Sequence, residues 1–195
     1  MHEQPVWRKL VSPGGFFLVL LCFALPFVTV SCEYPSGVVT LDYTGGDVLL
    51  GGEPNTTGMP PDLPRLDGPP ADAQLFAFLA FFTCFLGLCA GFAWVWRGRV
   101  LASLLSAGLA AMFLVVNQVT VVRRIKDEIE SSGRFPRGAG DQMVQTRAGF
   151  WLALGFLLLV IGYNVVEAVR QQSRTSVIRE PGNVPSPGTW RMRPR

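Results

Sequence analysis

Four long stretches of this chain contain no Asp, Glu, Lys, Arg or His, and they limit its fold more than any other feature. They run from Leu10 to Ser31, Ala73 to Trp96, Val100 to Val122 and Ala148 to Val166. A helix of about 20 apolar residues crosses the roughly 30 Å hydrocarbon core of a bilayer. Backbone polar groups in lipid must hydrogen-bond within their own segment, which favours helices. The sequence therefore predicts an all-α membrane protein, a bundle of four transmembrane helices.

The predicted layout follows these stretches. It has a cytoplasmic N-terminus (1–9), a first span (10–31), an external loop (32–72), a second span (73–96), a cytoplasmic turn (97–99), a third span (100–122), an external helical extension and loop (123–147), a fourth span (148–168) and a disordered basic cytoplasmic tail (169–195). Orientation follows the Lys and Arg count near span ends. Arg8 and Lys9 precede the first span, and no cation lies between Cys32 and Pro64. We therefore expect a multi-pass protein of the cell membrane with both termini in the cytoplasm.

Composition removes several classes of function. The net charge of +3 is far from the clustered basic character of a nucleic-acid binder, so we expect no nucleic-acid partner. The single histidine is His2, and no carboxylate, lysine or histidine lies inside a span. Proton-coupled transport would lack a relay, and His-based catalysis would lack its base. The four cysteines lack paired metal-ligand spacing, so we expect neither a metal site nor a cofactor, and no enzyme.

The first span has a competing interpretation. Pro26 interrupts it, and a positive flank followed by an apolar stretch is also typical of a signal peptide. Val28–Cys32 resembles a lipobox, in which Cys32 would be lipidated and become the new N-terminus of a three-span lipoprotein. We favour the retained helix, because the apolar stretch is long and Thr29 stands where lipoboxes prefer a larger aliphatic residue.

The external loop 32–72 predicts a small β-hairpin. Val38–Thr44 is rich in β-formers, Gly45-Gly46 is a turn signal, and Asp47–Leu50 would be the partner strand. An isolated hairpin is marginal in water, so its apolar residues should rest on the helix ends or the membrane surface; these are Val39, Leu41, Leu49 and Leu50. The Pro-rich stretch 53–70 is predicted to be a linker. The loop carries seven acids against Arg65, which we interpret as a solvated acidic surface rather than a cation site.

Two charged segments flank the last two spans. The positive charges of Arg123–Lys126 are balanced at i,i+4 spacing by the acids at 127, 128 and 130. This pairing would let the third helix continue into water as a stalk to about Ser131. The alternative is a surface that docks a partner. The tail carries Trp190 and Arg191 among several arginines, so it either contacts anionic lipid or a partner weakly, or remains solvated.

Small residues at four-residue spacing predict how the helices pack, because they let backbones approach each other in lipid. Gly87 and Gly91 of the second span are expected to meet a small-residue face of the third span, formed by Ser103, Ala107 and Ala111. The rival interpretation is a homodimer that uses the same two glycines. The fourth span has a looser stripe formed by Gly149, Gly155 and Gly162.

Three polar side chains fall inside spans, where an unpaired polar group is costly. They are Asn117, Gln118 and Asn164. We expect hydrogen bonds between helices from Asn117 or Gln118. The alternative is that these two residues line a path for a transported solute.

Two segments carry a resemblance to known proteins. Pro26–Cys32 and Tyr43–Gly52 resemble the first helix exit and first external loop of small four-span bacterial membrane proteins of uncharacterised function. This resemblance implies a topology and no activity. The layout also resembles claudin-like proteins, but the Trp and paired cysteines of their first loop are missing, so no function follows from it.

These features predict a non-enzymatic multi-pass membrane protein that is a structural or partner-binding component of a membrane assembly. Its partners would be the bilayer, anionic lipid at the tail, and another membrane protein or further copies of itself. The alternative is a small oligomeric channel or transporter component.

Overall fold

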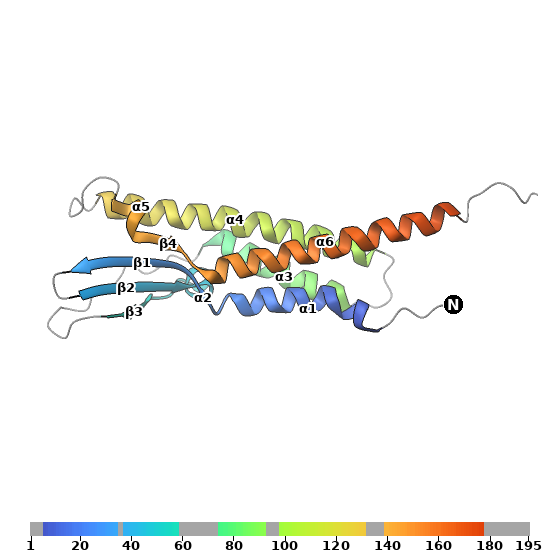
Figure 1. The fold of residues 1–195 in the computed structure, drawn as a ribbon, viewed down its shortest axis with the longest axis horizontal. Helices are drawn as coiled ribbons and strands as arrows, with labels where there is room; N and C mark the ends of the chain where they lie inside the picture. Colours follow the sequence, from blue (N-terminus) through green and yellow to red (C-terminus); the bar gives the residue numbers. More distant parts are fainter. Residues whose placement is uncertain (1–5, 35–36, 59–73, 93–97, 132–138, 178–195) are drawn as a thin grey trace, which may run out of the picture.

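The computed structural model describes residues 6–34, 37–58, 74–92, 98–131 and 139–177. It has a helix bundle with a small sheet at one end (Figure 1). The long helices are α1 (Val6–Cys22), α3 (Leu75–Phe92), α4 (Arg99–Ser131) and α6 (Ala148–Val177). The remaining elements are β1 (Pro26–Tyr34), β2 (Gly37–Thr44), α2 (Gly45–Leu50), β3 (Asn55–Thr57), α5 (Ala139–Met143) and β4 (Val144–Thr146).

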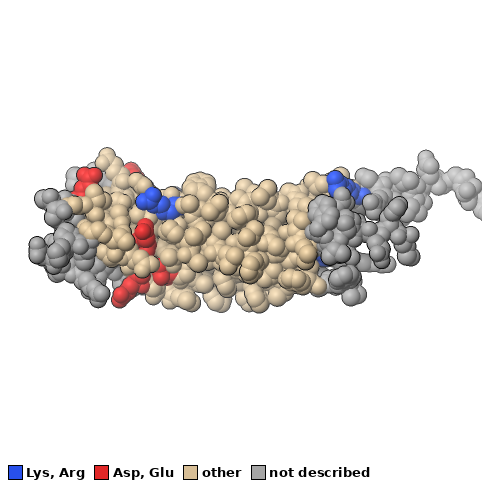
Figure 2. All heavy atoms as spheres, turned by 60° about the horizontal axis from the view of Figure 1, so that its bottom comes forward, with Lys and Arg blue, Asp and Glu red and all other residues tan. Residues whose placement is uncertain are grey.

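Among the described residues, three helices are long and apolar enough to cross a membrane: α3, α4 and the Ala148–Arg170 part of α6. The apolar part of α1, Leu10–Cys22, is shorter. It packs against both α3 and α6, and α4 packs against the same two helices. Figure 2 shows charged side chains near both ends of the visible face and none across its middle. The charge-free belt runs between Arg99 and Arg123 on α4 and between Arg147 and Glu167 on α6.

The prediction that the first span continues to Ser31 is wrong. Helix α1 ends at Cys22, and Pro26–Ser31 belongs to β1. Proline disfavours helical backbone in the residue before it, and it is tolerated as the first residue of a strand. The β-branched run Val28–Val30 then suits a strand. Membrane helices and buried strands can both lack charged residues, so the charge-free stretch does not indicate where α1 ends and β1 begins.

The predicted strand at Val38–Thr44 is confirmed as part of β2, but its predicted partner is wrong. It pairs with β1, and Gly45–Leu50 forms α2 instead of a strand. A capping box starts this helix: the Asp47 N–H donates to Thr44 Oγ1 at 3.1 Å, and the Thr44 N–H donates to Asp47 Oδ2 at 2.9 Å. Gly51 ends the helix with a φ of 77°, a conformation that favours glycine.

The sheet is antiparallel, with strand order β3-β2-β1-β4. Alternation along the strands gives it an inner apolar face and an outer polar face. The inner face joins the buried core through Val28, Val30, Tyr43 and Val144. Helix α4 has 33 residues, about 50 Å at 1.5 Å per residue, so it is longer than a bilayer core. Its last turns run beside the sheet (Figure 1), and Ile125 packs against the same core.

The helix bundle is built on small buried residues. All five buried residues of α3 are small and recur every three or four positions: Ala77, Ala80, Cys84, Gly87 and Gly91. Several large side chains of α3 are exposed, including Phe78, Phe82 and Phe85, whereas Phe81 and Leu88 pack against the core. This arrangement fits helices in lipid, where close backbone approach replaces the hydrophobic effect as the source of packing energy.

Two further predictions can be compared with the structure. Helix α4 ends at Ser131, where the charge pattern predicts the end of the helical extension. The prediction that the chain is disordered from residue 169 is wrong for its first part, because α6 continues to Val177. The stretch predicted to be a linker, 53–70, contains β3. Residues 59–73 lie outside the described part of the chain, and so do Trp190 and Arg191 of the tail.

Candidate functional site

The nearest neighbours of the two glycines of α3 belong to α1, whereas the prediction placed these glycines against α4. A Cβ atom built on Gly87 would lie 2.5 Å from Cζ of Phe16, and one built on Gly91 would lie 3.1 Å from Cβ of Pro13. Phe16 and Pro13 are fully buried, so a ring and a proline occupy the groove that the missing side chains leave. Gly87 and Gly91 thus allow close packing of α3 on α1 within one chain.

The other predicted packing residues divide into two groups. Ser103 and Ala107 of α4 are fully buried, and Ala111 packs partly buried against the core. Gly155 and Gly162 of α6 have no atom within 4 Å of a built Cβ, so they do not form the predicted packing stripe. Gly149 does pack tightly, because its built Cβ would lie 2.7 Å from the Pro26 carbonyl oxygen at the start of β1.

Each of the three predicted intramembrane polar residues is buried, with 2% to 6% of its surface exposed. Asn164 Nδ2 donates to Ser12 Oγ at 3.3 Å, which joins α6 to α1. Gln118 Nε2 donates to Thr146 Oγ1 at 3.1 Å, so its partner is β4 and not another helix. Asn117 Oδ1 has no hydrogen-bond partner, and neither does Ser103 Oγ. The hydrogen bond between helices comes from Asn164, whereas the prediction expected it from Asn117 or Gln118.

A polar network joins the helices to the sheet at the edge of the charge-free belt. Thr29 Oγ1 donates to Asp42 Oδ1 across β1 and β2 and accepts from Arg147 Nε at 2.9 Å. The Arg147 N–H also donates to the Phe27 carbonyl oxygen at 2.9 Å. Thr29 is fully buried, so its hydroxyl fixes three segments of the chain in one arrangement. Sequence reasoning placed Thr29 in a helix and could not find this network.

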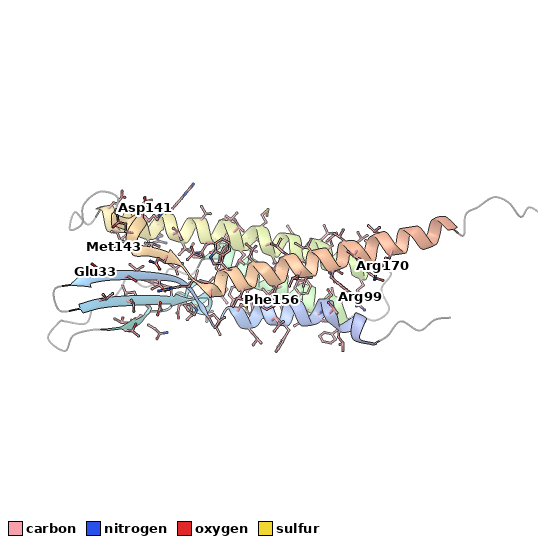
Figure 3. All side chains as sticks on the ribbon, viewed as in Figure 1. Glu33, Arg99, Asp141, Met143, Phe156 and Arg170 are labelled. Atoms are coloured by element: carbon pink, nitrogen blue, oxygen red, sulfur yellow. The ribbon has the colours of Figure 1, made fainter. Side chains whose placement is uncertain are left out.

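The outer face of the sheet is polar except at Val38. It consists of the residues whose strand positions share a face with Thr29 and Asp42: Ser31, Glu33, Val38, Thr40, Asn55, Thr57 and Gln145. Glu33, Asn55 and Gln145 are exposed, and Thr40 and Thr57 are hydrogen-bonded to each other through their hydroxyls. Figure 3 shows Glu33 near the end of β1 farthest from α1. The face can offer hydrogen bonds and negative charge to a partner.

Two titratable side chains belong to the inner face. Burial raises the pKa of the Cys32 thiol above its ordinary 9.0, which makes it a poor nucleophile. Burial, and then the nearby Glu128 carboxylate, raises the pKa of the Tyr43 phenol. Of the four apolar loop residues expected to rest on the helices, Leu41 and Leu49 pack against the core, and Val39 is buried. Leu50 is 78% exposed.

Among the described residues, no group of three or more His, Cys, Asp or Glu side chains could hold a metal ion. Arg147 and Asp42 are bridged by a threonine hydroxyl, an arrangement that fixes geometry. No protein-family model matches this chain, and no curated protein does either, so the resemblance to small four-span proteins stays a prediction.

Proposed function

We propose that this chain is a non-enzymatic membrane protein whose four long helices all cross the bilayer, and which presents the outer face of its sheet to a partner protein on the extracytoplasmic side. The helices would serve as an anchor and the sheet as a contact platform. Both termini would lie in the cytoplasm of a cell whose plasma membrane holds the bundle.

The packing of α1 supports its role as the fourth span. Its apolar part, Leu10–Cys22, gives about 20 Å of helix, and a bilayer thins locally around a short span at modest cost. Ser12 and Phe16 are buried between neighbours that are long enough to cross, so α1 lies beside them along most of its length. Figure 1 has the start of α1 and the end of α6 at the same end of the bundle, away from the sheet. An even number of crossings gives this arrangement.

The observation that carries the platform proposal is the difference between the two faces of the sheet. The inner face is buried with α4, whereas the outer face is polar and reaches beyond the charge-free belt. The Thr29–Asp42 and Thr40–Thr57 hydrogen bonds tie neighbouring strands together on that outer face. A preorganised surface loses little conformational freedom when it binds a partner. Its exposed acid, Glu33, fits a partner with a basic segment.

Site-specific photocrosslinking in intact cells tests this proposal. A photoreactive amino acid at Glu33, Asn55 or Gln145 should give an adduct with one protein, and Glu33→Lys should lower the yield from Asn55. The matched control is Asp127, which is exposed on α4. Equal adducts from Asp127, or adducts with lipid alone at all three sheet positions, would contradict a partner on the outer face.

The two alternatives receive less support from the geometry. A channel would need Asn117 and Gln118 to line a water-filled path, but both are buried and Gln118 is held by Thr146. Cleavage before Cys32 would remove Pro26–Ser31, the part of β1 that holds β4 and most of β2 in the sheet. The uncleaved chain is therefore part of our proposal.

A further inference from the structure

An apolar groove opens between α1 and α6 on the side of the bundle. It has a volume of about 510 Å³, and all the residues that line it are apolar or glycine. Its walls include Leu10, Gly14 and Leu18 from α1 and Phe156, Leu159 and Val160 from α6. The size falls within the range of small-molecule sites, which is about 300 to 1,000 Å³. The groove lies within the charge-free belt, so its surroundings in a bilayer would be hydrocarbon.

Gly14 gives the groove part of its depth. A Cβ built on this residue would meet no atom within 4 Å, and the residue is exposed in a helix whose next glycine, Gly15, packs tightly on Val160. The two glycines thus have different roles. Gly15 lets the helices approach, whereas Gly14 leaves open space beside the point of contact. A flexible chain of methylene groups has the shape and chemistry to fill such a space.

Cationic residues lie beyond the groove at the end of the bundle away from the sheet. Arg170 is 11 residues after Leu159, which is close to three turns, so both lie on the same face of α6. The separation along the helix is about 16 Å, close to half of a 30 Å hydrocarbon core. Figure 3 shows Arg170 on α6 past Phe156, toward that end. The sequence also places Arg8 and Lys9 directly before Leu10.

We propose that the α1–α6 groove holds one acyl chain of an anionic phospholipid whose phosphate lies at Arg170. The lipid would belong to the leaflet at the end where the two termini lie. A phosphate at Arg170 would put its acyl chain beside Leu159 within a single leaflet, and positive charge would favour an anionic over a zwitterionic headgroup. This inference rests on the proposed membrane bundle and adds a defined lipid site to it.

Native mass spectrometry of the full chain in mild detergent tests the site. The probes are phosphatidylglycerol and, as the zwitterionic comparison, phosphatidylcholine. The wild type should retain one phosphatidylglycerol, and Gly14→Leu should lower the retained fraction at least fivefold. Gly108→Leu is the matched control, because Gly108 is also an exposed helical glycine with no atom within 4 Å, on α4, which does not line the groove. Leu159→Trp fills the groove from the other wall and should have the same effect as Gly14→Leu.

A separate variant tests the role of the positive charge of Arg170. Arg170→Gln should reduce the preference for phosphatidylglycerol over phosphatidylcholine while leaving an acyl chain in the groove. Equal retention by Gly14→Leu, Leu159→Trp and Gly108→Leu would show only annular lipid and overturn the site. A disulfide-linked dimer formed through Leu18→Cys would also overturn it, because a second copy would then cover the groove. Resistance to alkaline carbonate extraction reports membrane insertion separately, so a failed lipid site stays distinguishable from a failed membrane anchor.

Discussion

The ring of Phe16 in α1 occupies the space that any side chain at position 87 in α3 would need. A Cβ built on Gly87 would lie between 2.5 and 2.8 Å from three carbons of that ring. Phe16 is fully buried, so the ring has little room to move away. The contact between α1 and α3 therefore depends on a glycine that the sequence pattern assigned to the α3–α4 hairpin.

Gly87→Ala should destabilise the bundle. Overpacking a tight core typically costs about 1 to 3 kcal/mol, which exceeds the gain of about 1 kcal/mol that alanine has over glycine in a helix. We expect a lower midpoint of thermal unfolding in detergent. The double variant Gly87→Ala/Phe16→Leu should recover part of the loss.

The control for this substitution is Gly108→Ala. Gly108 has no atom within 4 Å of a built Cβ, so alanine there should leave the midpoint unchanged or raise it. If Gly87→Ala behaves like Gly108→Ala, the α1–α3 contact described here is not the one present in detergent.

Asn117→Leu should stabilise the protein, and Asn164→Leu should destabilise it. The first variant removes a buried oxygen that has no partner, which relieves a penalty of about 1 to 3 kcal/mol. The second removes the bond from Asn164 to Ser12, and bonds between membrane helices average about 0.6 kcal/mol. Unfolding midpoints of the two variants, measured side by side in one detergent, should move in opposite directions. Destabilisation by both would mean that Asn117 has a partner that compensates for its burial.

Thr29→Val should loosen the sheet while leaving the helices in place. The variant keeps the shape of the side chain but removes the hydroxyl that bonds both Asp42 and Arg147. Hydrogen bonds to charged groups contribute about 1.5 to 3 kcal/mol. Hydrogen exchange should therefore quicken in β1, β2 and β4. Thr120→Val is the control, because the Thr120 hydroxyl is exposed and bonds only the carbonyl oxygen of Val116 in its own helix. No difference in exchange between these variants would rule out a structural role for the network.

The stability of the sheet should fall in alkali through Tyr43. Its pKa is raised above the ordinary value of 10.0, so the folded protein holds the phenol proton more tightly than the unfolded chain does. The resulting stabilisation is fully present below pH 10 and is lost as the pH rises through the raised pKa. The advantage of the wild type over Tyr43→Phe in unfolding midpoint should therefore shrink as the pH rises above about 10. An advantage that stays constant over this range would show that Tyr43 is not buried as described.

The sequence predicted the long apolar elements and the end of α4 at Ser131, but not the end of the first helix or that of α6. Charge-free stretches located α3, α4 and α6 because a span needs about 20 such residues. The predicted first span, 10–31, was too long because Pro26–Ser31 also lacks charge but belongs to strand β1. Gly45-Gly46 predicts a hairpin turn, but it is the first turn of helix α2. The sequence signal for the helix is the capping box formed by Thr44 and Asp47.

The candidate site depends on contacts that a single sequence does not encode locally. Small residues show that a helix face can pack closely, but any neighbouring helix can fill it, and at Gly87 the neighbour is α1. Thr29 and Arg147 are 118 positions apart, and no local pattern links them. Gln118 was recognised as a polar residue that needs a partner, yet Thr146 became available only once β4 was placed beside β1.

The central claim is that four helices cross the bilayer with both termini on one side and the sheet on the other. Single cysteines in a cysteine-free chain test it most directly, at Gln145 on the sheet and at Arg99 at the opposite end of α4. We predict that an impermeant maleimide labels Gln145→Cys in intact cells and labels Arg99→Cys only after permeabilisation, while reporter fusions place both termini in the cytoplasm. Termini on opposite sides of the membrane, or labelling of both cysteines in intact cells, would contradict the account.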